Sequence, residues 1–137
     1  MKMGRNFPQS ILAFLEAPNY MILGTIGKAG TPHLTIVWFF YDKGLFKISI
    51  TKTRVKYKNI LRNPRVSCLI YDRSDPYRYL QIRGAVVKIE EDPEYIFGDF
   101  LCARYGRDEN YRRDPVRKKE GRVTVNIRPD GFYSKGL

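Results

Sequence analysis

Short apolar stretches with the alternation typical of β-strands recur along the chain, and turn residues separate them. Six stretches are predicted as strands, at residues 21–26, 31–41, 45–50, 66–71, 79–89 and 123–127. Glycine-containing turns at residues 27–30 and 42–44 join the first three into an antiparallel meander. Gly84 lies inside the fifth stretch and predicts a β-bulge. The turn residues Pro129-Asp130-Gly131 are expected to end the sixth strand, and Phe132 and Tyr133 then add a short extension.

Three other segments have the spacing of short helices. They cover residues 8–15, residues 54–61 and a stretch from Asp92-Pro93 to about residue 105. Thr51 or Thr53 is a candidate N-cap for the second helix, and Asn63-Pro64 would stop it. The helical residues expected to face the interior are Ile11, Leu12, Leu15, Tyr57, Ile60, Leu61, Ile96, Phe97, Phe100 and Leu101.

These elements predict a mainly β fold with small helices, a six-stranded antiparallel barrel in which few sheet edges stay exposed. At 137 residues, with no linker or internal repeat, the chain is expected to form a single domain spanning residues 1–137. A five-stranded OB-type barrel has a similar size, and the pattern alone does not separate the two.

The composition excludes several classes of protein. A hydrophobic content of 43% argues against a disordered chain. No apolar run reaches the ~20 residues that cross a bilayer, and the first residues do not form a secretory signal, so a cytoplasmic protein is expected. Cys68 and Cys102 lie among apolar neighbours and read as reduced, buried thiols. His33 is the only histidine, and no metal site is expected.

The net charge of +11 indicates an anionic partner, which composition alone leaves open as nucleic acid, a membrane surface or a phosphorylated small molecule. Residues 43–71 contain eight basic residues and no Asp or Glu. Residues 104–119 contain seven basic residues interleaved with Asp108, Glu109 and Asp114, which favours a solvated loop. The first block is therefore the better candidate for an anion site.

The junction between the strand at 45–50 and the helix at 54–61 lies inside that block. A helix N-terminus presents unpaired N–H groups and a positive dipole end, which suit a phosphate. Thr51 and Thr53 contribute hydroxyls there, and Arg54 and Lys56 contribute cations. Cations in a first helical turn are locally unfavourable, and a bound phosphate would relieve that conflict. The alternative is a solvated helix face.

Several short motifs follow one another along the chain. They are a Gly-x-x-Gly turn followed by Pro32-His33-Leu34 and Ile36-Val37-Trp38-Phe39, then Thr51-x-Thr53-Arg54-x-Lys56-x-x-Asn59, Asn63-Pro64-Arg65-Val66, the run from Asp75 to Gly84, and the run from Arg122 to Pro129. Over roughly residues 10–133, the order of these motifs resembles the pyridoxamine-phosphate-oxidase-like split-barrel superfamily, and in particular its flavin/deazaflavin oxidoreductase branch that uses coenzyme F420.

The resemblance implies a homodimer with coenzyme clefts between the subunits, and hydride transfer from coenzyme F420 to a small organic acceptor. It implies that Ile36, Val37 and Trp38 lie along the ring system. It also implies that Thr51, Thr53, Arg54 and Lys56 hold the phosphate and that Asn59 supports their loop. Tyr77, Arg78 and Tyr79 would come from the other subunit. No catalytic residue is expected, because the coenzyme performs the chemistry.

Three alternatives remain beside this interpretation. In the first, the same fold would bind FMN, whose phosphate would also suit Arg54 and Lys56. In the second, the protein would carry its coenzyme without catalysis. A nucleic-acid-binding barrel is the third, with basic residues on phosphates and aromatic residues on bases. Most aromatic residues lie in apolar strand runs such as Trp38-Phe39-Phe40, where core packing is expected, so nucleic acid is disfavoured. Core packing is likewise the alternative role for Trp38, Tyr77 and Tyr79.

Overall fold

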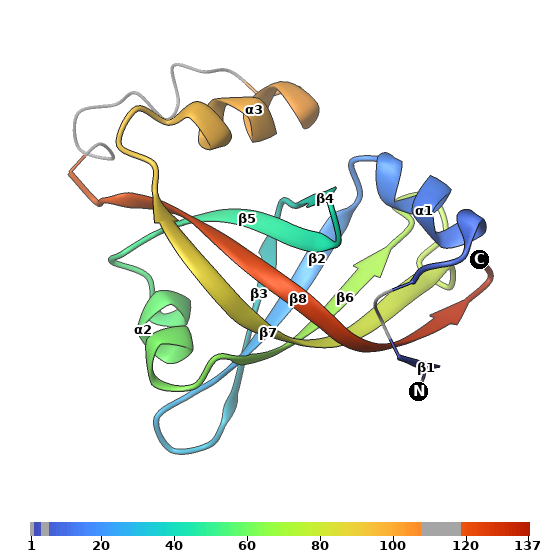
Figure 1. Ribbon diagram of the computed structural model, residues 1–137, viewed down its shortest axis with the longest axis horizontal. Helices are drawn as coiled ribbons and strands as arrows, with labels where there is room; N and C mark the ends of the chain where they lie inside the picture. Colours follow the sequence, from blue (N-terminus) through green and yellow to red (C-terminus); the bar gives the residue numbers. More distant parts are fainter. Residues whose placement is uncertain (1, 4–5, 108–118) are drawn as a thin grey trace.

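The computed structural model of the chain describes residues 2–3, 6–107 and 119–137 (Figure 1). The basic cluster at residues 104–119, predicted to be a solvated loop, lies largely outside the described residues. In chain order the elements are β1 (Lys2–Met3), α1 (Gln9–Glu16), β2 (Tyr20–Ile26), β3 (Pro32–Val37), β4 (Phe40–Asp42), β5 (Leu45–Thr51), α2 (Val55–Arg62), β6 (Arg65–Tyr71), β7 (Tyr79–Glu91), α3 (Ile96–Arg104) and β8 (Arg122–Lys135).

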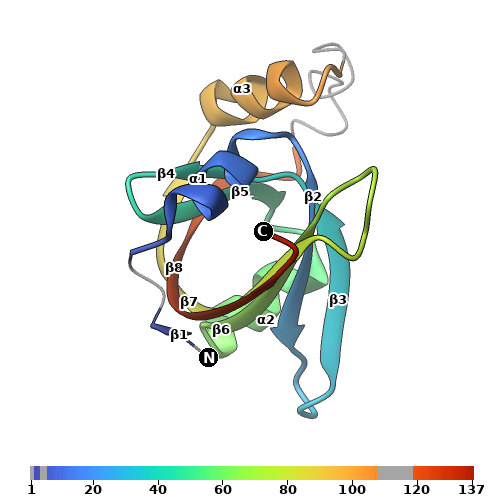
Figure 2. The ribbon, with the colours of Figure 1, turned by 90° about the vertical axis from the view of Figure 1, so that its right-hand side faces the viewer.

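The strands form one antiparallel sheet in the order β3-β2-β6-β7-β8-β5-β4, with β1 added to β8. Figure 2 shows this sheet curving round on itself, so that its two halves enclose a common interior. The long strands β7 and β8 run through the middle and connect the halves. The prediction of a mainly β, antiparallel barrel is confirmed.

Alternation of side chains along the strands builds the core. In β5, Phe46, Ile48 and Ile50 point inward, while the residues between them are partly exposed. Alternate residues of β2, β6 and β7 face the same interior, which follows from the two-residue period of a strand. Lys43 and Gly44 form the tight turn between β4 and β5. Both have positive φ, as the central residues of a type I′ hairpin turn require.

The described residues contain eight strands, so the predicted count of six was too low. The stretch predicted as one strand at 31–41 is broken at Trp38 and Phe39 into β3 and β4. The last strand does not end at Pro129-Asp130-Gly131 but continues to Lys135, because β7 pairs with it along that whole length. The bulge predicted at Gly84 is confirmed in its position by a shift in the pairing register between Arg83 and Gly84, but the extra residue is Asp130 of β8.

The helices differ from prediction at their ends and faces. Helix α2 begins after Arg54 as N-cap, so neither threonine caps it, and Leu61 lies on its exposed side. Helix α3 begins at Ile96, four residues later than expected, after Tyr95 in a left-handed conformation. Ile96 and Phe100 are exposed rather than inward, because only one face of α3 packs on β5 and β8.

Helix α3 lies across one end of the barrel near β5, and α2 lies on the side next to β2 (Figures 1 and 2). Cys68 and Cys102 are buried, as predicted, and burial raises the pKa of the Cys68 thiol to about 12. Within the described ranges, every helix is too short or too polar to cross a bilayer.

Candidate functional site

A cavity of about 330 Å³ lies where β3, β5, α2, α3 and β8 meet, and we name it the β5–α2 cavity. This volume is at the lower end of the range for small-molecule sites. Its lining residues are Ile36, Val37, Trp38, Ser49, Ile50, Thr51, Arg54, Lys56, Gly98, Leu101 and Arg122. Six of the residues predicted from the sequence to contact a coenzyme therefore meet in one place.

The N-terminus of α2 opens onto this cavity with the features of an anion site. No side chain caps its first amides, and its first turn has no acidic residue. The chain reaches the helix through a turn in which the Arg54 N–H donates to the Thr51 carbonyl at 3.2 Å. The Thr51 and Thr53 hydroxyl oxygens lie 3.0 Å apart, which orients both at the start of the helix. Helix amides beside cations bind phosphate groups well.

Arg54, Lys56 and Arg122 all line the cavity, so three cations lie close together there. Burial and the nearby charges of Arg54 and Arg122 lower the pKa of Lys56. No carboxylate of the described residues forms an ion pair with Arg54 or Lys56. The Lys56 ammonium instead donates to the Thr35 hydroxyl at 3.3 Å, and Arg122 donates to the Ser49 hydroxyl at 3.1 Å. An anion in the cavity would stabilise the protonated lysine.

The opposite wall of the cavity is apolar and partly aromatic. Val37 is buried, Trp38 is half-buried and Ile36 is 62% exposed. The Trp38 indole stacks on the Tyr105 ring, with centroids 4.9 Å apart and planes within 9° of parallel. The cavity thus combines cations with apolar and aromatic lining residues. This arrangement fits an anionic group joined to an aromatic ring system.

Two predicted residues support the cavity without lining it. The Thr53 side chain is exposed and touches the site through Thr51. Asn59 is buried, and its amide donates to the Thr25 hydroxyl at 3.0 Å while its oxygen accepts from Arg62 at 3.1 Å. Asn59 therefore fixes α2 to β2, and its expected support of the loop that holds the phosphate stays a prediction.

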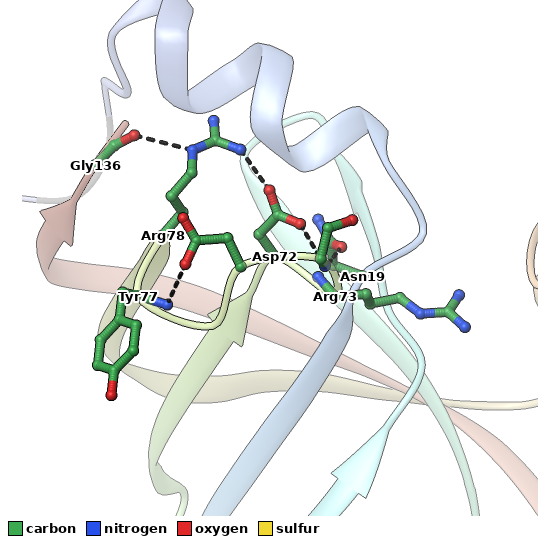
Figure 3. Close-up of polar contacts among 8 residues, drawn as sticks. Asn19, Asp72, Arg73, Tyr77, Arg78 and Gly136 are labelled. Atoms are coloured by element: carbon green, nitrogen blue, oxygen red, sulfur yellow. Dashed lines mark hydrogen bonds and ion pairs between the residues drawn. The ribbon is translucent and has the colours of Figure 1, made fainter.

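Tyr77 and Arg78 lie on the turn between β6 and β7, and Tyr79 is the first residue of β7; none of the three lines the cavity of the same chain. Figure 3 shows the Arg78 guanidinium between Asp72, with which it forms an ion pair, and the Gly136 carbonyl, 3.1 Å away. Tyr77 is 75% exposed, and the Tyr79 ring lies near the Tyr133 ring. Their contact with a coenzyme held by a second subunit stays a prediction.

Five lining residues were not singled out from the sequence: Ser49, Ile50, Gly98, Leu101 and Arg122. Pairing of β5 with β8 places Arg122 opposite Thr51, so knowledge of that register would have found the arginine. Gly98 and Leu101 come from α3, where nothing in the local pattern separates a cavity wall from the core.

A larger concavity of about 730 Å³ lies over the outer face of β2, β6 and β7. Its cations include Arg128, which is paired with Asp130 at 2.7 Å. The β5–α2 cavity has less volume, but it contains Arg54 and Lys56, which form no ion pair with a described carboxylate, so it is the better candidate for an anionic ligand.

Residues 7–135 match the pyridoxamine 5'-phosphate oxidase family, and the chain belongs to it. The chain is similar to a solved structure of an F420 reductase, with 35% identity, a TM-score of 0.83 and coverage of 93% of this chain and 98% of that one. A conserved hypothetical protein from Mycobacterium tuberculosis has 27% identity, a TM-score of 0.71 and coverage of 96% and 86%. General Stress Protein 26 from Bacillus anthracis, at 22% identity and a TM-score of 0.70, covers 93% and 92% and shares the fold. The split barrel expected from the motifs is confirmed.

Proposed function

We propose that the protein is an oxidoreductase that binds coenzyme F420 in the β5–α2 cavity and reduces a small organic acceptor. One observation carries the proposal: Arg54 and Lys56, without a described carboxylate partner, share a cavity with the apolar and aromatic residues Ile36, Val37 and Trp38. The similarity to an F420 reductase along nearly the whole of both chains supports the choice of coenzyme.

The residues present fit the parts of this coenzyme. Arg54, Lys56 and the first amides of α2 would hold a phosphodiester oxygen, and Arg122 lies beside them. Ile36, Val37 and Trp38 would lie along the ring and exclude water from one of its faces. When bound and reduced, the deazaflavin supplies a hydride, and the protein contributes binding and orientation.

We propose that the active form is a homodimer, in which Tyr77, Arg78 and Tyr79 of one subunit approach the coenzyme of the other. Within one chain Ile36, which lines the cavity, is 62% exposed, and Leu34 on the same face of β3 is 65% exposed. A second subunit over this side would complete the enclosure. Sedimentation velocity with and without coenzyme measures the oligomeric state, and a monomer at all protein concentrations would contradict the proposed homodimer.

The test of the function compares coenzyme F420, FMN and single-stranded DNA in binding titrations at several salt concentrations. We expect saturable, tight binding of F420, weaker binding of FMN, and weak DNA binding that falls steeply with salt. Preference for FMN would change the coenzyme and keep the site. Saturable DNA binding with no affinity for either flavin would contradict the proposal. Turnover with bound, reduced F420 and a panel of acceptors then separates an enzyme from a carrier.

A further inference from the structure

A column of stacked side chains leads from the surface to the wall of the β5–α2 cavity. The Arg73 guanidinium carbon lies 4.5 Å from the centroid of the Tyr20 ring. Tyr20 stacks on Tyr105 at 6.2 Å and 11°, and Tyr105 stacks on Trp38 at 4.9 Å and 9°. Trp38 lines the cavity, so the orientation of its indole depends on a ring that does not touch the cavity itself.

Two hydrogen bonds fix the position of the Tyr105 hydroxyl. It donates to the Asn19 carbonyl at 2.6 Å and accepts from the Phe39 N–H at 3.1 Å. Burial raises the pKa of Tyr105, so this hydroxyl keeps its proton at neutral pH. Phe39 directly follows Trp38, and Tyr105 therefore holds both the indole and the backbone next to it.

Arg104 completes the attachment of this backbone. Its guanidinium donates to the Phe39 carbonyl at 3.1 Å and to the carbonyls of Leu15, Glu16 and Ala17 at the end of α1. Arg104, the last residue of α3, thus binds the C=O of Phe39, and the next residue, Tyr105, binds its N–H. These bonds replace the sheet pairing that the chain lacks between β3 and β4, because buried backbone groups need partners.

We propose that Tyr105 is a positioning residue that holds the Trp38 indole as a fixed wall of the β5–α2 cavity, with Arg104 holding the backbone that carries it. The part of this proposal that concerns coenzyme affinity rests on the proposed function, while the part that concerns the indole does not. A wall that is already ordered lowers the entropy cost of binding a flat ring, because no side chain has to be immobilised.

Trp38 is the only tryptophan, so the fluorescence of the free protein reports on it alone. In Tyr105→Leu we expect the emission to shift to longer wavelength, the acrylamide quenching constant to rise and the anisotropy to fall. Tyr105→Phe keeps the ring and should restore most of these values. Tyr105→Met, with a flexible side chain that fills gaps, gives the same readout if the leucine variant does not fold.

Phe100→Leu is the matched control. Phe100 belongs to α3, the helix that Tyr105 directly follows, and packs on Phe40 at 4.7 Å and 73°. Its loss therefore weakens the contact of α3 with β4 and leaves the stack on Trp38 intact. We expect wild-type emission from this variant. Unchanged emission in Tyr105→Leu, or an equal shift in Phe100→Leu, would overturn the positioning role.

Titration with F420 tests the second part. The loss of one aromatic stack predicts affinity lower by about 2- to 12-fold in Tyr105→Leu, with most of it restored in Tyr105→Phe. Equal affinity in the wild type and Tyr105→Leu, despite a displaced indole, would overturn this part. If wild-type protein does not bind F420 but Tyr105→Leu still shifts the emission, the proposed function fails and the positioning role stands.

Discussion

Arg54 follows strand β5 and Arg78 follows strand β6, and both were expected from the sequence to contact the coenzyme. Arg78 forms an ion pair with Asp72 and donates to the Gly136 carbonyl, so its charge already holds the turn and the C-terminal segment together. Arg54 faces a cavity that it shares with Lys56 and Arg122. The two arginines differ in their neighbours: Arg78 has a carboxylate partner, Asp72, six residues earlier in the sequence, and Arg54 has no described carboxylate partner. A paired arginine stabilises the fold, whereas an unpaired one is available to a ligand.

The largest effect should come from removing the cation that is available. Arg54→Ala is expected to lower the affinity for F420 by roughly 10- to 150-fold, because a charge-assisted contact contributes about 1.5–3 kcal/mol. Fluorescence titration measures the change. Lys58→Ala removes an equal charge from an exposed position of the same helix and should leave the affinity near that of the wild type. Equal losses in the two variants would mean that α2 attracts the coenzyme only through its overall charge.

A smaller effect is expected from pH. The pKa of Lys56 is lowered in the folded protein, so its proton is lost at a pH below the ordinary lysine value of about 10.4. Coenzyme affinity should fall as the pH rises through that lowered pKa. The stability of the free protein should rise over the same window, because the unfolded chain there binds more protons. Lys56→Arg stays charged and should bind with little pH dependence, and a matching fall in that variant would exclude Lys56 as the cause.

The weakest effect on affinity is expected at the paired arginine. Arg78→Ala should lower the affinity for F420 less than Arg54→Ala, because the charge of Arg78 is already paired with Asp72 where it approaches the coenzyme of the second subunit. It should also unfold at a lower temperature in calorimetry, because it loses its bonds to Asp72 and Gly136. An affinity loss as large as that of Arg54→Ala would show that the ion pair does not weaken the contact of this guanidinium with the coenzyme. This result would contradict the distinction between Arg54 and Arg78 and would support a coenzyme site formed by two subunits.

The same pair predicts how acid affects stability. The Ser74 backbone N–H and the Arg78 side chain lower the pKa of Asp72. Its contribution to stability is therefore fully present above the unfolded-state value, which is near pH 4, and is lost as the pH falls through the lower, folded value. Acid titration followed by circular dichroism should show Arg78→Ala unfolding at higher pH than wild type. Superimposed curves would mean that the ion pair contributes nothing.

Local pattern was sufficient where neighbours in sequence determine the structure. The strands β2, β5 and β6, helix α2 and the bulge at Gly84 follow from alternation, helical spacing and glycine. The break at Trp38 and Phe39 does not, because the groups that bind Phe39 are Arg104 and Tyr105, more than sixty residues later. The cationic part of the cavity was predictable because Thr51, Arg54 and Lys56 are adjacent in sequence. Its α3 wall depends on how the helix docks, which local spacing does not determine.

The bulge at Gly84 restricts which substitutions the protein tolerates. A methyl group there would overlap the carbonyl oxygen of Arg128, and the residue paired with Gly84 is Pro129, which has no N–H to offer a rearranged ladder. Neither strand can shift to make room without breaking the pairing of β7 with β8, the two longest strands of the sheet. In a mutational library, defects at this position should therefore appear as poor yield of folded protein, whereas defects at Arg54 should appear in well-folded protein that has lost its ligand.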